Sequence, residues 1–164
     1  MKMKNFLKAI TAFFLCTSFP GCATDDMTEL FNGRDLGNFY TFLDAHGIDQ
    51  DPLNVFTVHD GMIRISGEAY GYLATRATYS NYHLTVQFKW GEASFSPRAD
   101  NARDSGVLLH ADGEDMLWPR SIEAQIIEGG TGDIILIGGT QLSVNGETKS
   151  SGRFDRFGKG PWQD

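Results

Sequence analysis

The stretch Ser121-Ile-Glu-Ala-Gln-Ile-Ile127 indicates both the fold and the strongest candidate site. Successive side chains of a β-strand point to opposite faces of its sheet. In this stretch the even-numbered side chains are all apolar, whereas Glu123 and Gln125 share the opposite face. We therefore expect a strand with one face packed in a core and the other free to bind a ligand.

The rest of the chain also reads as strands and turns. Residues 54–58 and 62–65 flank the pair Asp60-Gly61, which is the usual pattern of a β-hairpin. Residues 82–90 alternate strictly, so we expect a strand whose even-numbered side chains, Tyr82 to Trp90, belong to the core. Further short strands are predicted at residues 70–75, 105–110, 133–137 and 141–144. No window of a dozen residues has a helical period, so the prediction is an all-β, antiparallel β-sandwich.

Length and charge limit the function. A chain of 164 residues with 41% hydrophobic positions builds one core. It contains 14 Lys and Arg and 21 Asp and Glu, which gives a net charge of −7. The sequence has no cluster of basic residues. Nucleic acid is therefore excluded as a partner.

The N-terminus has the layout of an export signal. Three lysines precede the apolar residues 9–19, a run too short to span a bilayer, so residues 1–21 are predicted to be a signal peptide. Cys22 follows Pro20-Gly21, as in a bacterial lipoprotein signal, and lipidation of its thiol is expected; ordinary cleavage near Ala23 is the alternative. Residues 22–28 form a tether and 29–164 the domain. We expect an exported protein, in the periplasm or on the outer membrane or cell surface, touching membrane only through a lipid anchor.

Candidate site residues gather between residues 98 and 139. Arg103 and Asp104 precede the predicted strand 105–110, and His110 ends it. Glu128 falls on the packed side of a regular strand, so it joins Glu123 only if a bulge or the following turn re-aims it. There is no His-x-His and no pair of cysteines, so no metal is predicted, and no cofactor is implied.

Four motifs carry a family resemblance. They are Leu30-Phe-Asn-Gly-Arg-Asp-Leu36, Val58-His-Asp-Gly-Met-Ile63, Arg103-Asp-Ser-Gly-Val107 and Arg120-Ser-Ile-Glu-Ala-Gln-Ile-Ile-Glu-Gly129. Together they resemble the 3-keto-disaccharide hydrolase family. The resemblance implies a concanavalin A-like lectin/glucanase sandwich, a jelly roll, that acts on glycosides oxidised at C3. Family members usually continue past a Gly-Pro-Trp-like segment, so we expect this domain to lack its C-terminal strands.

The implied chemistry needs a base and a partner for an oxyanion. A ketone at C3 acidifies the C2 proton, and its removal expels the C1 substituent. Glu123 or His110 is the candidate base. Arg103 and Arg120 are candidates to stabilise the enolate or hold hydroxyls, and Gln125 to hydrogen-bond a hydroxyl while orienting the carboxylate. Asp104 is a further candidate contact to the sugar.

Other functions stay open at this point. Glu123-x-Gln125-x-x-Glu128 is similar to the catalytic strand of retaining glucanases, which use two carboxyl groups about 5 Å apart. A non-catalytic carbohydrate-binding domain, or an inactive remnant of either enzyme, is a further alternative. For sugar stacking Trp118, in a loop beside a proline, is the better candidate than Tyr72.

Overall fold

The structure is a computed structural model that describes residues 27–155. The predicted signal peptide, the Cys22 lipidation site and the last residues of the chain lie outside this range. Within it the chain forms eleven strands and no helix. Accordingly, the described part of the chain offers no helix able to cross a membrane.

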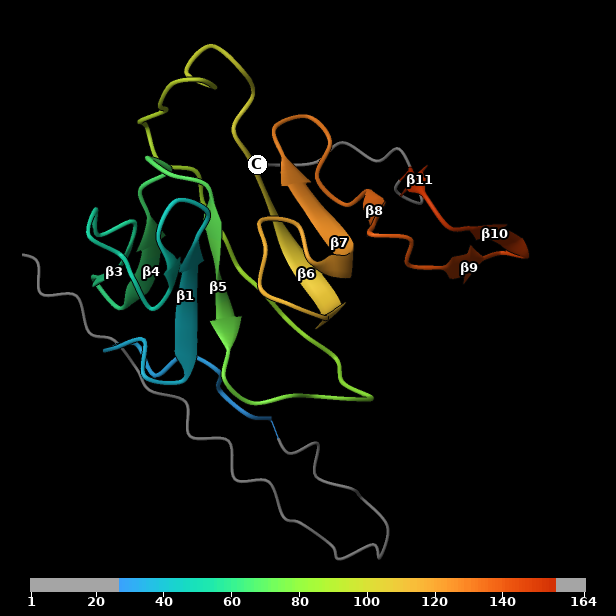
Figure 1. Ribbon diagram of the computed structural model, residues 1–164, viewed down its shortest axis with the longest axis horizontal. Helices are drawn as coiled ribbons and strands as arrows, with labels where there is room; N and C mark the ends of the chain where they lie inside the picture. Colours follow the sequence, from blue (N-terminus) through green and yellow to red (C-terminus); the bar gives the residue numbers. More distant parts are fainter. Residues whose placement is uncertain (1–26, 156–164) are drawn as a thin grey trace, which may run out of the picture.

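The strands assemble into antiparallel sheets (Figure 1). Two of these sheets have more than two strands, with the orders β2-β1-β5 and β11-β8-β7-β6, and two hairpins, β3-β4 and β9-β10, accompany them. This arrangement confirms the expected all-β, antiparallel class, while the jelly-roll order remains a prediction. The strand bounds are β1 Phe39–Leu43, β2 Gly47–Ile48, β3 Phe56–His59, β4 Met62–Ile65, β5 Gly71–Thr75, β6 Asp104–Asp112, β7 Arg120–Ile127, β8 Ile134–Ile137, β9 Leu142–Val144, β10 Glu147–Lys149 and β11 Gly152–Phe154.

The hairpin β3-β4 forms where the sequence predicts it. His59 pairs with Met62, and the two residues between them turn the chain. Asp60 and Gly61 have φ values of 50° and 71°, the left-handed backbone that a two-residue turn of this hand requires. The Asp-Gly pair therefore fixes the register of the hairpin.

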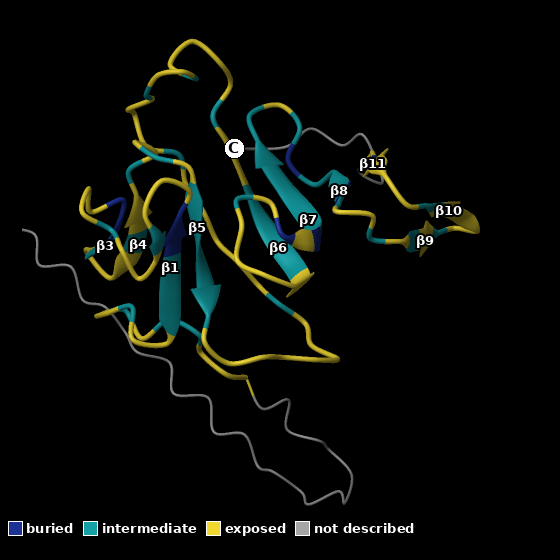
Figure 2. Cartoon of the chain, in the orientation of Figure 1, coloured by how far each residue is buried: buried dark blue, intermediate teal, exposed yellow. Residues whose placement is uncertain are grey.

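The buried residues form a small core beside β1. Leu43 and Val55 are fully buried, and Phe56 packs with them. Leu36, Ala69 and Leu73 are partly buried against this cluster. Two further buried residues, Leu136 and Phe154, lie in β8 and β11. Most of β5 and β7 is only partly buried (Figure 2). Packing in the described residues is thus strongest at β1 and along one face of the sheet that holds β7.

Residues 82–90 correct the sequence analysis, because the strand predicted there does not form. The stretch connects β5 to β6, each an edge strand, and no strand pairing with it is present in residues 27–155 (Figure 1). Tyr82, Val86 and Phe88 are 38%, 50% and 43% exposed, whereas Trp90 is partly buried. Alternation indicates two different faces, but a strand also needs a neighbour for its backbone groups. The predicted core face is therefore largely in solvent.

Candidate functional site

The polar face of the β6-β7 hairpin gathers the main candidates. Facing residues of an antiparallel pair share one side of the sheet. Asp104 faces Ile127, Gly106 faces Gln125, and Leu108 faces Glu123. The residue pairs between these three point to the other side of the sheet. On that side Ile122 of β7 faces the buried Leu136 of β8. The alternation predicted for β7 is present, although its even-numbered and odd-numbered side chains are buried to a similar extent, and Asp104 joins Glu123 and Gln125 through the register of β6.

Gly106 makes room for the Glu123 side chain. Both residues lie on the polar face, one strand apart. A Cβ atom at position 106 would overlap Oε1 of Glu123 and lie 2.7 Å from its Cδ and Cγ. Real Cβ atoms do not come this close to other atoms, so any side chain at 106 displaces the carboxylate. The absence of a side chain at Gly106 therefore sets the position of Glu123.

Glu123 has the electrostatics of a base. Partial burial raises the pKa of its carboxyl above the ordinary value, and the negative charge of Asp104 adds to this rise. Within residues 27–155, no hydrogen bond or ion pair is made by the carboxylate of Glu123. Its charged form thus lacks local stabilisation, which makes it a better proton acceptor than an exposed glutamate.

Asp104 links two further polar groups to this face. Nη2 of Arg98 lies 3.0 Å from Oδ2 of Asp104, and Nε2 of Gln125 donates a 3.1 Å hydrogen bond to Oδ1. This fixes the Gln125 amide, whose Oε1 is buried and has no hydrogen-bond partner in the described structure. A buried acceptor without a donor is costly. This oxygen is enclosed by the protein, so the Gln125 amide acts on this face through its hydrogen bond to Asp104.

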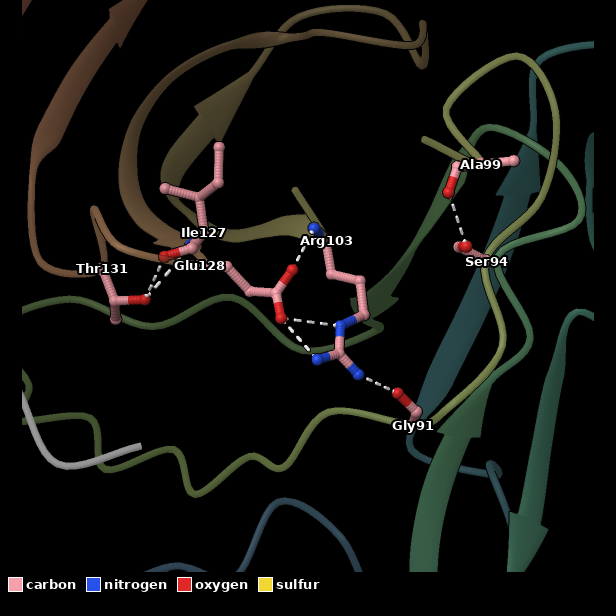
Figure 3. A network of polar contacts seen from close by, with 7 residues as sticks. All are labelled: Gly91, Ser94, Ala99, Arg103, Ile127, Glu128 and Thr131. Atoms are coloured by element: carbon pink, nitrogen blue, oxygen red, sulfur yellow. Dashed lines mark hydrogen bonds and ion pairs between the residues drawn. The ribbon is translucent and has the colours of Figure 1, made fainter. Parts of the chain in front are cut away.

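Glu128, unlike Glu123, is bound by an arginine, Arg103 (the contacts of Glu128 are drawn in Figure 3). It follows β7 in a turn, and its backbone N–H donates to the carbonyl of Arg103. The backbone N–H of Arg103 donates to Oε2 of Glu128 at 2.7 Å and Nε donates to Oε1 at 2.9 Å, while Nη2 donates to Oε1 as well. The hydrogen bonds from Arg103 lower the pKa of Glu128. Glu128 is therefore held as a carboxylate in an ion pair.

Arg103 has further partners. Its Nη1 donates to the carbonyl of Gly91, and its guanidinium lies 5.5 Å from the ring centroid of Trp90 (the Gly91 contact is drawn in Figure 3). Arg103 and Asp104 belong to different ion pairs, Arg103–Glu128 and Arg98–Asp104. Successive side chains of an extended backbone point to opposite sides, so Arg103 and Asp104 contact different groups although they are adjacent in sequence.

The other predicted site residues lie toward the far end of the hairpin. His110 sits in a bulge with a φ of 52°, and its ring stacks on Tyr82 with centroids 5.5 Å apart. Arg120 lies 3.5 Å from Asp112 in an exposed ion pair. Trp118 is 61% exposed. The structure thus brings together Glu123, Gln125 and Asp104, and places these other candidates apart from them; the roles of all of them stay predictions.

The Glu123 cluster consists of Glu123, Gln125, Asp104, Gly106 and Arg98. The sequence analysis did not identify two of these residues, Gly106 and Arg98. Gly106 carried a signal, because a glycine inside a predicted strand often marks a close approach. Arg98 carried none, since its contact depends on the path of the loop before β6. No cluster of three or more potential metal ligands occurs in residues 27–155.

A comparison with sequence families places the chain. The model of the family described as 3-keto-alpha-glucoside-1,2-lyase-like domain matches residues 26–162. The chain belongs to this family. No curated protein and no solved structure matches it. The resemblance carried by the four sequence motifs is thereby confirmed, and the Glu123 cluster lies within the matched part of this 3-keto-α-glucoside-1,2-lyase-like domain.

Proposed function

We propose that the protein cleaves 3-keto-glycosides, with Glu123 as the base that removes the C2 proton. One observation carries the proposal: the Glu123 carboxylate, partly buried and with a raised pKa, lies over Gly106 on the face of β7 that also holds Gln125. The family description supports a 3-keto-glucoside as substrate. The chemistry needs a base, and the raised pKa of Glu123 makes its carboxylate a stronger proton acceptor than an ordinary glutamate.

The reaction is an elimination. Oε of Glu123 accepts the proton from C2, and the electron pair of the C2–H bond is delocalised onto the C3 ketone as an enolate. The enolate then collapses to a C1=C2 double bond while the bond from C1 to the leaving oxygen breaks. The leaving group takes up a proton, from Glu123 or from water, and departs as an alcohol. Addition of water across the double bond gives the free 3-keto-sugar.

The neighbours of Glu123 support binding and charge stabilisation. We assign Gln125 to hold Asp104 in place, because its Nε2 donates to Oδ1 of Asp104 and its own Oε1 is buried. We assign the enolate to Arg98, because its ion pair with Asp104 ties it to the polar face that holds Glu123, whereas Arg103 is tied to Glu128. Hydrogen-bond donors directed at an oxygen that becomes negatively charged commonly raise the reaction rate about 10²-fold or more. This corresponds to about 3 kcal/mol of transition-state stabilisation.

Conventional retaining hydrolysis gains no support from Glu128. That mechanism requires one carboxyl group that is protonated at the working pH and acts as the general acid. With its lowered pKa, Glu128 could serve only as the ionised nucleophile of that mechanism, and the hydrogen bonds from Arg103 occupy both of its carboxylate oxygens. The elimination needs no second carboxyl group, so we prefer it.

We further propose that the protein acts outside the cytoplasm. The lysine-flanked apolar segment at residues 9–19 and Cys22 support export and lipid anchoring, in the periplasm or at the outer membrane or cell surface. A test is the mass of the mature protein from a bacterial membrane fraction. A lipid-modified Cys22 at its N-terminus is expected, and an intact residue 1 overturns the proposal.

The catalytic proposal is tested by separating turnover from affinity. With methyl 3-keto-α-D-glucoside as substrate, Glu123→Gln is expected to lower kcat by about 10²-fold or more, because general-base catalysis is lost. Affinity for the unoxidised methyl glucoside should stay within a few-fold, since the amide keeps the shape of the side chain. Glu68→Gln, an exposed glutamate away from the cluster, is the matched control and should leave both unchanged. Full turnover by Glu123→Gln would contradict the proposal.

A further inference from the structure

The loop between β6 and β7, residues 113–119, is tied to the sheet that contains β1 and β5. Oδ1 of Asp115 accepts a 2.8 Å hydrogen bond from the hydroxyl of Tyr40 in β1 and another from the hydroxyl of Tyr72 in β5. The Tyr72 ring is itself stacked on Phe42, with centroids 5.1 Å apart. The loop is therefore held at Asp115 by two rigid strands.

This anchored loop leaves its largest apolar side chains in solvent. Trp118 is 61% exposed and Met116 56%. Tyr70, which immediately precedes β5, is 46% exposed, and its ring centroid lies 6.5 Å from that of Trp118 at an angle of 56°. Exposed aromatic side chains that adjoin one another on a fixed support are typical of binding surfaces. Their rings also lose little conformational entropy on binding.

A polar group stands in the same loop, three residues before Trp118. Both tyrosine hydroxyls use Oδ1 of Asp115, and in residues 27–155 no group donates to its Oδ2. A carboxylate oxygen of this kind can accept hydrogen bonds from ligand hydroxyls. Aromatic faces together with an unused carboxylate oxygen match a sugar, which has an apolar C–H face and a rim of hydroxyl donors. The negative charge of Asp115 and of the chain disfavours an anionic ligand.

We propose that Trp118, Tyr70 and Asp115 bind a glucosyl unit of the substrate other than the one that is cleaved. The rings of Trp118 and Tyr70 cover the C–H face, and Oδ2 of Asp115 accepts a hydroxyl hydrogen bond. β7 begins at Arg120, three residues before Glu123, which is about 10 Å along a strand. The patch therefore lies away from the base. Two parts of this proposal rest on the proposed function: that the bound sugar is a glucoside, and that it belongs to the substrate.

The test uses the full chain and maltotriose, an α-glucoside without a C3 ketone, titrated by calorimetry. Wild type is expected to bind it, and Trp118→Ala to weaken binding at least tenfold. Trp118→Phe, which keeps an aromatic ring, should restore most of the affinity, while Asp115→Asn should weaken it several-fold. Tyr79→Ala removes an exposed tyrosine that belongs to no contact described in this patch, so it is the matched control and should bind as wild type does.

The outcomes separate this proposal from the catalytic one. Failure of the wild type to bind maltotriose, or undiminished binding by Trp118→Ala, overturns the sugar patch. Equal loss in Trp118→Phe and Trp118→Ala, with near-ultraviolet circular dichroism unchanged, also overturns it, because stacking on the ring is then not required. Maltotriose cannot undergo the proposed elimination, and methyl 3-keto-α-D-glucoside has no second sugar unit. Either proposal can therefore fail while the other stands.

Discussion

Two glutamates near the end of one strand have opposite environments. Glu123 is partly buried in β7 beside the negative charge of Asp104, and its pKa is raised. Glu128, five residues later, receives three hydrogen bonds from Arg103, and its pKa is lowered. The residue type is the same, so the surroundings decide the chemistry. The first carboxyl is suited to accept a proton, and the second to hold a loop in place.

The largest expected contrast is in turnover. Glu123→Gln should lower kcat/KM on a 3-keto-glucoside by about 10²-fold or more, whereas Glu128→Gln should lower it by less than about tenfold in the folded protein. Steady-state kinetics on both variants, with near-ultraviolet circular dichroism to verify folding, provide the measurement. A larger loss for Glu128→Gln would reverse the assignment and favour a mechanism with two carboxyl groups.

The space over Gly106 gives the next contrast. Gly106→Ala places a methyl group where the Glu123 carboxylate lies, so we expect a loss of kcat of about tenfold or more by misplacement of the base. Gly91→Ala is the matched control, because a Cβ at position 91 meets no atom within 4 Å. Equal activity of the two variants would show that the position of Glu123 does not matter. Thermal unfolding should report near-native stability for both.

The pH dependence sharpens the role of Asp104. Its charge contributes to the raised pKa of Glu123, so Asp104→Asn should lower that pKa. Activity that requires the Glu123 carboxylate rises as pH passes through its pKa. The rising limb of the kcat/KM profile should therefore move to lower pH in Asp104→Asn. An unmoved limb would assign it to another group, such as His110.

Stability against pH should show the smallest and most specific contrast. The lowered pKa of Glu128 contributes stability that is present above its ordinary value of 4.5 and is lost as pH falls through the folded-state pKa. The raised pKa of Glu123 acts in the opposite sense: its neutral form favours the fold, and that stability is lost as pH rises above the ordinary value of 4.5.

Thermal unfolding from pH 2 to 8 measures both effects. Glu128→Gln should flatten the acid side of the Tm profile, and Glu123→Gln should raise Tm near neutral pH. The same slope in both variants would contradict the contrast between the two environments.

The two-faced pattern of β7 and the Asp60-Gly61 hairpin follow from local sequence, and both are found in the structure. Residues 82–90 show the limit of the same reasoning. Their alternation matches that of β7, yet β7 has β6 and β8 beside it and 82–90 has no paired neighbour in the described residues. Periodicity reports which side chains share a face, whereas strand pairing depends on segments distant in sequence.

The candidate site divides in the same way. That Glu123 and Gln125 share a face is a property of one strand and is predictable. The register of β6 against β7 brings Asp104 to the same face. The same pairing places Gly106 where its missing side chain leaves space for the Glu123 carboxylate. The turn after β7 sends Glu128 to Arg103, which alternation alone cannot give. β1 escaped prediction because Phe39–Leu43 is apolar or aromatic at nearly every position and so shows no alternation.

The most direct test of Glu123 as the base is proton removal itself. Methyl 3-keto-α-D-glucoside is incubated with the protein in D₂O, and its C2 proton and the released methanol are followed by ¹H NMR. Wild type should remove the C2 proton, seen as deuterium at C2 or as elimination, and Glu123→Gln should slow this removal by about 10²-fold or more. Removal of the C2 proton at the wild-type rate by folded Glu123→Gln would contradict the account.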